Sequence, residues 1–454
     1  MGAGTHGPGD RTGGTLTSRD SVGFRLLRLC LGLALLVGAS LPAAAQGGAM
    51  PTPETFKRFL VELWPDAKGF GVSRATFDAA LKGVELDLTL PDLIIPGRTE
   101  HDARGQAEFT RTPAEYLNDS QLARLSAQGM KLREQYADAL AKIEREIGVQ
   151  PQFVLAIWGR ETAYGAHKVL PHYAIQVLAN QAYLGRRKDM FRNELLHALK
   201  MLEAGVITRD KMKSSWAGAM GLTQFMPSEY FTTAVDLDGD GIKDIWGSVP
   251  DALASAANQL KQKGWVRGQS WGYEVRLPKA MSCRMEGPDN AKTVQQWIDL
   301  GVVRTGGAAF PKHALDQQAF ILSPGGAHGP AFLALENFMV IKRYNMSDLY
   351  ALFVGNLGDR IAGGKAFDTP WKDVKQMQAK GIAEIQQRLQ ARGAPIAKID
   401  GKAGMNTRSL IGKYEAEQGL PVDCWPTQAV LDRLRASEET GAADKAKRKA
   451  VDAR

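Results

Sequence analysis

Apolar residues recur at helical spacing over most of this chain, and this periodicity predicts a mainly α-helical fold. The spacing is clear at 56–63, at 132–143 and again at 195–202. Residues 272–320 are mixed, and 273–277 alternate between apolar and polar side chains as a short strand does. We therefore expect helices throughout, with a smaller β contribution in the second half of the chain.

The length of the chain and a Gly- and Pro-containing stretch within it predict more than one domain. With 454 residues, two or three domains are expected. A large domain is predicted at 50–365, and the Gly- and Pro-containing stretch 363–373 is interpreted as a linker. A compact module of three short helical patterns follows at 376–437, the second of them capped by Asn406 or Thr407. Residues 438–454 are charged and aperiodic, so we expect a disordered tail.

The N-terminal segment has the features of an export signal. Arg25 and Arg28 precede an apolar run at 29–41, and three alanines at 43–45 offer a cleavage site. Residues 1–45 are therefore predicted to be a signal peptide that is cleaved, with the mature protein in the periplasm. An uncleaved membrane anchor is the alternative. No later segment is apolar enough to span a membrane, so no transmembrane segment is expected in the mature chain.

Cysteine content and charge restrict the function only weakly. Cys30, Cys283 and Cys424 are too few for a disulfide framework or a thiolate metal site. Cys283 and Cys424 fall in different predicted domains; a bridge between them is possible but unsupported, and Cys424 is interpreted as a packed thiol. The whole chain carries +8, and the mature chain about +6, which suits anionic partners. No nucleic-acid-binding motif is present, so nucleic acid is not an expected partner.

One acidic residue lies on the apolar stripe of its own helix. Pro151 suits the first turn of a helix, and Phe153, Ile157 and Glu161 follow at intervals of four. A carboxyl group in that setting loses hydration, which raises its pKa and favours the protonated form that a general acid needs. A buried glutamate held by Arg160 for structural reasons is the alternative that this helix alone leaves open.

A second segment has the ligand spacing of a calcium-binding loop. Asp236, Asp238, Asp240 and Asp244 occupy positions 1, 3, 5 and 9 of an EF-hand pattern, and Gly241 occupies position 6. The carbonyl of Ile242 would be a further ligand, and Asp251 would replace the missing glutamate of position 12. We expect a single structural Ca²⁺ or Na⁺ within 236–251 and no organic cofactor. A solvated turn without a metal is the alternative.

These segments occur in an order that resembles one enzyme family. They are 107–110, 156–162 and 216–228, then the acidic loop, 258–265 and 343–345. Together they resemble the membrane-bound lytic murein transglycosylase B family (glycoside hydrolase-type family 103) over 56–362. The resemblance implies a lysozyme-like α (α+β) fold and Glu161 as the single catalytic acid and base. It also implies a sugar-binding groove lined by Ser215, Gln224, Tyr344, Asn345 and Tyr350. Gln259 stands where a close relative has a tyrosine.

The module at 376–437 resembles the peptidoglycan-binding type 1 domain. The match is carried by residues 400–408 and by 419–423. The resemblance implies a small three-helix domain that binds peptidoglycan, and a plain three-helix spacer is the alternative.

These resemblances imply a lytic transglycosylase acting on glycan strands of peptidoglycan. The enzyme would cleave the β-1,4 bond between N-acetylmuramic acid and N-acetylglucosamine and leave a 1,6-anhydromuramic acid end. A hydrolytic muramidase and a non-catalytic wall-binding protein are the alternatives; the products of the first would differ in mass by one water.

Overall fold

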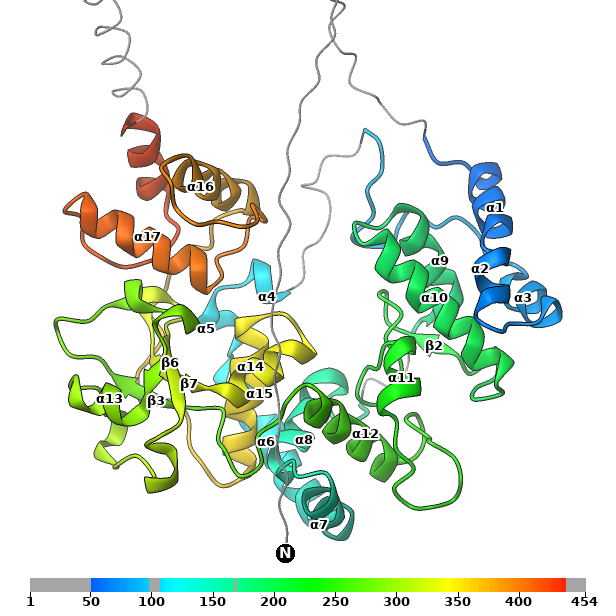
Figure 1. Ribbon diagram of the computed structural model, residues 1–454, viewed down its shortest axis with the longest axis horizontal. Coiled ribbons are helices and arrows are strands. Elements are labelled where there is room, and N and C mark those ends of the chain that lie inside the picture. Colours follow the sequence, from blue (N-terminus) through cyan, green and yellow to red (C-terminus); the bar gives the residue numbers. More distant parts are fainter. Residues whose placement is uncertain (1–49, 98–106, 167–169, 438–454) are drawn as a thin grey trace, which may run out of the picture. The chain divides into compact units, whose positions relative to one another are not determined.

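The computed structural model describes residues 50–97, 107–166 and 170–437, which all belong to one compact unit, Ala49–Arg454 (Figure 1). The predicted signal peptide at 1–45 and the predicted disordered tail at 438–454 lie outside the described residues. Within the described residues, no helix combines the length and the apolar character needed to cross a membrane.

One group of helices forms a core from the first part of the chain. Its members are α1 (Pro53–Glu62), α2 (Trp64–Gly69), α3 (Arg74–Leu81), α9 (Ala174–Leu184), α10 (Lys188–Glu203) and α11 (Pro227–Thr233). Thr52 caps α1 and Pro53 opens it, as the local sequence favours. Two short strands, β1 (His172–Tyr173) and β2 (Lys213–Ser214), pair antiparallel beside this group.

A second group of helices surrounds the helix that carries Glu161. It contains α5 (Pro113–Tyr116), α6 (Asp119–Gln135), α7 (Ala137–Glu146), α8 (Pro151–Thr162), α12 (Val249–Gln262), α14 (Glu336–Tyr344) and α15 (Asp348–Ile361), and the one-turn helix α4 (Ala107–Thr110) precedes it. Helix α15 packs closely on α8, since a Cβ added at Gly358 would lie 2.7 Å from the Phe153 ring. A glycine is thus required at that contact.

A five-stranded antiparallel sheet follows, and most of it escaped the sequence analysis. The strand order is β4–β6–β7–β3–β5, formed by β3 (Gly272–Arg276), β4 (Lys292–Thr293), β5 (Val303–Arg304), β6 (Gln318–Leu322) and β7 (Ala331–Leu335). Helix α13 (Val294–Asp299) places Trp297 in the core of the sheet, where its indole donates to the carbonyl of Ala319 at 2.9 Å. Short 3₁₀ turns complete the region: η2 (Cys283–Met285), η3 (Pro288–Asn290), η4 (Thr305–Gly307), η5 (Lys312–Ala314) and η6 (Gly326–His328).

The C-terminal module has three helices: α16 (Ala379–Ala391), α17 (Met405–Glu417) and 428–437. The predicted cap of the second helix is wrong. Helix α17 starts at Met405, and Thr407 is buried within it, where its hydroxyl accepts from the Gln386 side chain at 3.0 Å. Residues 362–378, which precede α16, contain no helix or strand. They are not a free linker, because Trp371 packs onto Gly329.

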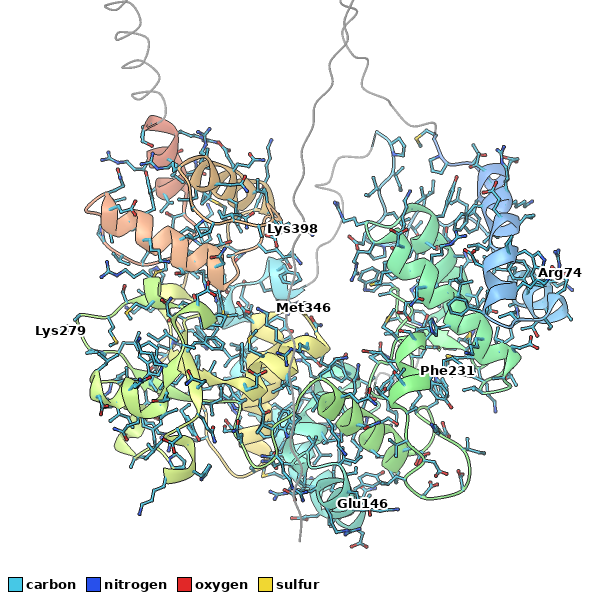
Figure 2. The ribbon with its side chains drawn as sticks, viewed as in Figure 1. Arg74, Glu146, Phe231, Lys279, Met346 and Lys398 are labelled. Carbon is cyan, nitrogen blue, oxygen red and sulfur yellow. A yellow bond between two sulfur atoms is a disulfide. The ribbon has the colours of Figure 1, made fainter. Side chains whose placement is uncertain are left out.

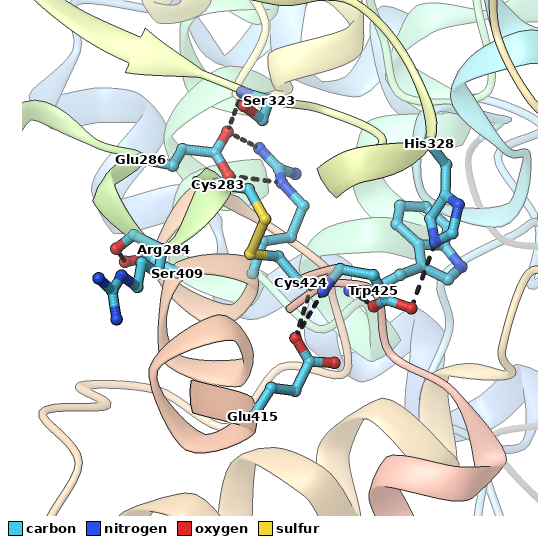
Figure 3. The surroundings of a disulfide bond; sticks show 11 residues. Cys283, Arg284, Glu286, Ser323, His328, Ser409, Glu415, Cys424 and Trp425 are labelled. Atoms are coloured by element: carbon cyan, nitrogen blue, oxygen red, sulfur yellow. Dashed lines mark hydrogen bonds and ion pairs between the residues drawn. A yellow bond between two sulfur atoms is a disulfide. The ribbon is translucent and has the colours of Figure 1, made fainter. Parts of the chain in front are cut away.

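The module is joined to the sheet region covalently and by a buried ion-pair network (Figure 3). A disulfide links Cys283 to Cys424, so the expectation of a packed Cys424 thiol is wrong. Beside it, Arg408 of α17 donates to both carboxylate oxygens of Glu286, at 2.9 and 2.6 Å, and to Asp348 at 3.1 Å. Because these three side chains are nearly inaccessible to solvent, the module has a defined position on the large domain.

Candidate active site

Glu161 lies at the C-terminal end of α8, as its place on the apolar stripe predicts. Phe153 and Ile157, on the same stripe, are buried, and Glu161 itself is half-buried. The helix ends abruptly after it, since Ala163 and Tyr164 both have left-handed backbones, with φ of 50° and 59°. The carboxyl group is therefore held at a rigid helix end, partly shielded from water.

Tyr350 provides the direct partner of this carboxyl group. Its hydroxyl donates to Oε1 of Glu161 from a ring that is almost fully buried in α15. Burial, reinforced by the nearby charge of Glu161, raises the pKa of Tyr350 well above its usual value. The phenol thus remains protonated and donates to the acid at any physiological pH.

Tyr344 connects this pair to the loop on the other side of the site. Its ring stacks on that of Tyr350, with centroids 6.4 Å apart and an angle of 9° between the planes. Its hydroxyl donates to the carbonyl of Thr223 at 2.7 Å. Asn345 follows Tyr344 directly in an extended conformation and its carbonyl accepts from Ser347 at 2.6 Å. Four of the six predicted catalytic and groove residues therefore lie together: Glu161, Tyr350, Tyr344 and Asn345. A fifth, Gln224, lies in the loop that Tyr344 contacts through the carbonyl of Thr223.

The segment 215–225 forms a tight loop that holds Ser215 and Gln224. A 2.9 Å hydrogen bond from the amide of Ser215 to the carbonyl of Ala219 closes its first half, and a bridge between Met220 and Phe225 closes its second half. The loop is fixed to α8 because the hydroxyl of Thr162, next to Glu161, donates to the carbonyl of Leu222 at 2.7 Å.

The glycines of this loop serve packing against the protein. A Cβ at Gly218 would lie 2.3 Å from Leu178, and one at Gly221 would lie 2.7 Å from the carbonyl of Ile245. Both residues also have left-handed backbones, with φ of 86° and 74°. The small size of Gly218 and Gly221 therefore allows close contact with the core. This packing by itself explains why glycines occupy the two positions.

Left-handed backbone at non-glycine residues concentrates around Glu161. Ala163 and Tyr164 follow the acid, and Gln224, in the loop fixed to the same helix end, has φ of 57°. Such conformations cost on the order of 1 kcal/mol or more each and persist only where surrounding contacts enforce them. Here Tyr164 is held by its hydroxyl, which donates to the carbonyl of Leu125 at 2.9 Å. Strained residues of this kind cluster at functional sites.

Arg160 packs against the tyrosine that binds Glu161, whereas the sequence suggested it only as a structural partner of a buried glutamate. Its guanidinium donates to the hydroxyl of Tyr116 at 2.5 Å and lies over the rings of Tyr116, Tyr350 and Phe353 at 5.0, 5.8 and 5.3 Å. It therefore packs on the same tyrosine that binds Glu161. No local pattern reveals these contacts, because their partners lie far away in the chain.

An aromatic-lined cavity of about 670 Å³ lies along the same helix. Trp158 and Thr162 of α8 line it together with Tyr136, Tyr164 and Trp246. The indole N–H groups of Trp158 and Trp246 are buried and have no hydrogen-bond partner among the described residues. No spacing signal in the sequence distinguishes these aromatic residues from residues of the hydrophobic core.

The acidic loop brings together three of the predicted cation ligands. Carboxylate oxygens of Asp236, Asp238 and Asp251 lie within 4.8 Å of one another. Asp251 is buried and also accepts from the amides of Leu237 and Asp244, at 2.8 and 3.0 Å, so it braces both sides of the loop. This donor set of clustered carboxylate oxygens fits a hard cation such as Ca²⁺.

The other two predicted ligands lie in the same loop but outside that group of three. Asp240 is exposed, and its carboxylate accepts from the amide of Ile242 at 2.7 Å. The Ile242 side chain is 59% exposed, which is consistent with a contribution through its carbonyl alone. Gln259, the departure from the resemblance, is buried in α12.

Comparisons with known proteins agree with this geometry. Residues 55–359 match the family described as "Transglycosylase SLT domain". The chain is 34% identical to membrane-bound lytic murein transglycosylase B of Escherichia coli over 244 residues, 52% of this chain. The match spans 63% of that relative's length.

Solved structures show the similarity over a larger share of the chain. SltB3 from Pseudomonas aeruginosa in complex with NAG-anhNAM-pentapeptide superposes with a TM-score of 0.74 at 40% identity, covering 84% of this chain and 99% of that one. The E. coli lytic transglycosylase Slt35 in complex with calcium gives a TM-score of 0.53 at 27% identity, covering 70% and 95%. The fold is mostly helical and lysozyme-like with a small sheet, as the sequence analysis expected.

Proposed function

Because this chain belongs to the transglycosylase SLT domain family, we propose that it is a lytic murein transglycosylase. Its substrate is the glycan strand of peptidoglycan, and it cleaves the β-1,4 bond between N-acetylmuramic acid and N-acetylglucosamine. The observation that carries the proposal is Glu161, half-buried at a strained helix end and bonded by the Tyr350 hydroxyl.

The reaction requires one carboxyl group that acts twice. Glu161 donates its proton to the bridging oxygen, and the bond from C1 of the muramic acid to that oxygen breaks. The acetamido oxygen of the same sugar stabilises the positive centre at C1. The carboxylate of Glu161 then removes the proton of the C6 hydroxyl, whose oxygen forms a bond to C1. A 1,6-anhydro end results, and no water is consumed.

The neighbours of Glu161 have separate roles in this proposal. Tyr350 is a positioning residue, because its hydroxyl donates a hydrogen bond to Oε1 of Glu161. Ser215, Gln224, Tyr344 and Asn345 contact the sugars. The first step needs Glu161 in its protonated form.

A bound Ca²⁺ would have a structural role. Asp236, Asp238 and Asp251 would hold it, with Asp240 and the carbonyl of Ile242 as further ligands; the calcium complex of Slt35 supports this choice of ion. The cation would neutralise the clustered carboxylates and stabilise the loop before α12. No step of the reaction passes through it.

The protein acts outside the cytoplasm, in the periplasm after cleavage of the 1–45 segment. The substrate lies there, and the Cys283–Cys424 disulfide is of a kind that persists in oxidising compartments. The module at 376–437 binds peptidoglycan and holds the enzyme on the wall.

Mass spectrometry of the products released from purified sacculi tests the proposal. Wild-type protein should release anhydro-muropeptides, and Glu161→Gln should release none while keeping its fold. Glu146→Gln, at an exposed glutamate of α7, is the matched control and should retain full activity. Reducing-end products, heavier by one water, would instead assign the enzyme to the hydrolytic muramidases. Full activity in Glu161→Gln would refute the role of this residue.

A further inference from the structure

A second cavity, of about 540 Å³, lies where the C-terminal module meets the large domain. From the large domain, Arg111, Met346 and Asp348 line it; from the module, Lys398 and Lys413 do so. Met346 and Lys398 are labelled in Figure 2. The walls cannot separate freely, because the disulfide and the buried Arg408–Glu286 pair fix the module in place. The cavity is therefore a permanent feature of the protein.

This cavity begins beside the residues that support Glu161. Ser347 and Asp348 line it and start α15, and Tyr350 on the same helix donates to Glu161. The rise from residue 348 to 350 is about 3 Å along the helix axis. Met346, 70% exposed, directly follows the groove residue Asn345. The cavity lining and the proposed groove thus share the segment 345–350.

The rim of the cavity is predominantly cationic. Arg111, Lys398 and Lys413 are exposed, and the two lysines form no ion pair within the described ranges. Deeper in, the charges are balanced, since Arg408 and Lys342 face Glu286 and Asp348.

The rim has fewer exposed acidic side chains than exposed cationic ones. The Asp400 carboxylate accepts from Gln386 at 2.9 Å and from the amide of Lys402 at 3.0 Å, so its charge is partly offset. Asp289 is the other exposed acid of the rim. An occupant with several carboxylates and a single amine would complement this arrangement.

We infer that this cavity binds the peptide stem carried by the muramic acid of the substrate. The inference rests on the proposed function and names a second binding site for the same substrate. Peptidoglycan stems are short peptides with several carboxylates and one free amine, which matches the rim. The cationic side chains bind the carboxylates, Asp289 binds the amine, and the exposed thioether of Met346 contacts the alanine methyl groups.

Binding of the free stem tests the site without cleavage. A synthetic pentapeptide stem is titrated into Glu161→Gln protein by calorimetry, and the titration is repeated after adding Lys398→Glu and Lys413→Glu. Affinity should fall roughly ten-fold or more, because two exposed attractions become repulsions. Lys279→Glu, an exposed charge reversal outside the cavity lining, is the control and should leave the affinity unchanged. No binding of the peptide, or equal binding by the double variant, overturns the inference.

Cleavage kinetics provide a second readout in the active enzyme. Glycan strands with their stems, and the same strands after amidase treatment, are compared as substrates. Lys398→Glu with Lys413→Glu should raise KM for the stem-bearing strands roughly ten-fold and leave kcat unchanged, with no effect on bare strands. An equal rise of KM for both substrates overturns the inference. If wild-type protein cleaves neither strand, the proposed function fails, and peptide binding still decides the stem site.

Discussion

Replacement of Arg408 by methionine should destabilise the protein through the acid that it leaves behind. Arg408 donates twice to Glu286 and once to Asp348, and the side chains of all three are at most 6% exposed. Asp348 keeps a second cation, Lys342, at 2.6 Å. Among the described residues, Glu286 keeps only the amide of Ser323, at 2.7 Å. Glu286 is therefore the acid that the substitution leaves without a compensating charge.

The magnitude follows from the burial of that charge. Removing one partner of a buried ion pair costs about 3–5 kcal/mol. Protonation of Glu286 limits the loss, since burial raises the pKa of this residue to about 7 even with Arg408 present. A carboxyl with a raised pKa is tolerated in the folded state when protonated and disfavoured when ionised, so stability falls as pH rises. Arg408→Met should thus cost more at pH 8 than at pH 5.5.

Urea denaturation at the two pH values measures this difference. Glu286→Gln in the Arg408→Met background should restore more than about 2 kcal/mol at pH 8, because it removes the uncompensated charge. A cost of Arg408→Met below about 1 kcal/mol at pH 8, the range of an exposed pair, would show that Glu286 is not held by a buried ion pair. Failure of the second substitution to restore stability would show the same.

Three further variants, one of them a double substitution, and one metal-removal experiment with its own control variant give separate outcomes. Burial raises the pKa of Asp359 to about 7, so the wild type loses up to roughly 4 kcal/mol as pH rises from 4 to 7, and Asp359→Asn should flatten this slope in urea titrations. Cys283→Ser with Cys424→Ser should lower the free energy of unfolding by about 2–4 kcal/mol under oxidising conditions and by nothing in excess reductant. Tyr350→Phe should lower kcat roughly ten-fold with little change in KM, as loss of one hydrogen bond to the acid requires. A calcium chelator should lower the Tm of wild type, and Asp238→Ala, lacking a clustered carboxylate, should respond little.

The helices were predictable from the sequence, and the sheet largely was not. The apolar periodicity of a helix can be recognised within about a dozen residues, as in the stripe through Phe153, Ile157 and Glu161. The strands β4 and β5 have two residues each, which is too short for an alternating pattern. Their pairing with β6 and β3 depends on contacts between distant segments, which no local window contains.

The acid of the candidate site was likewise predictable, whereas its environment was not. The position of Glu161 on its helix is a local property. Its partner Tyr350 lies 189 residues later, and nothing in the surrounding sequence identifies the hydroxyl as a donor to that carboxyl. Arg408 and Glu286, 122 residues apart, each resemble ordinary surface charges until the fold buries them together. Side chains that act in pairs across the chain become visible only in three dimensions.

The buried join between the module and the large domain has a consequence for how the protein can be divided. A binding module on a flexible tether raises the effective concentration of its enzyme and can be exchanged without loss. Here a cut after residue 365 would remove Arg408 from two buried acids and leave Cys283 unpaired. The two parts are therefore one folding unit that contains two recognisable sequences, and the boundary between those sequences is not a place where the protein can be separated.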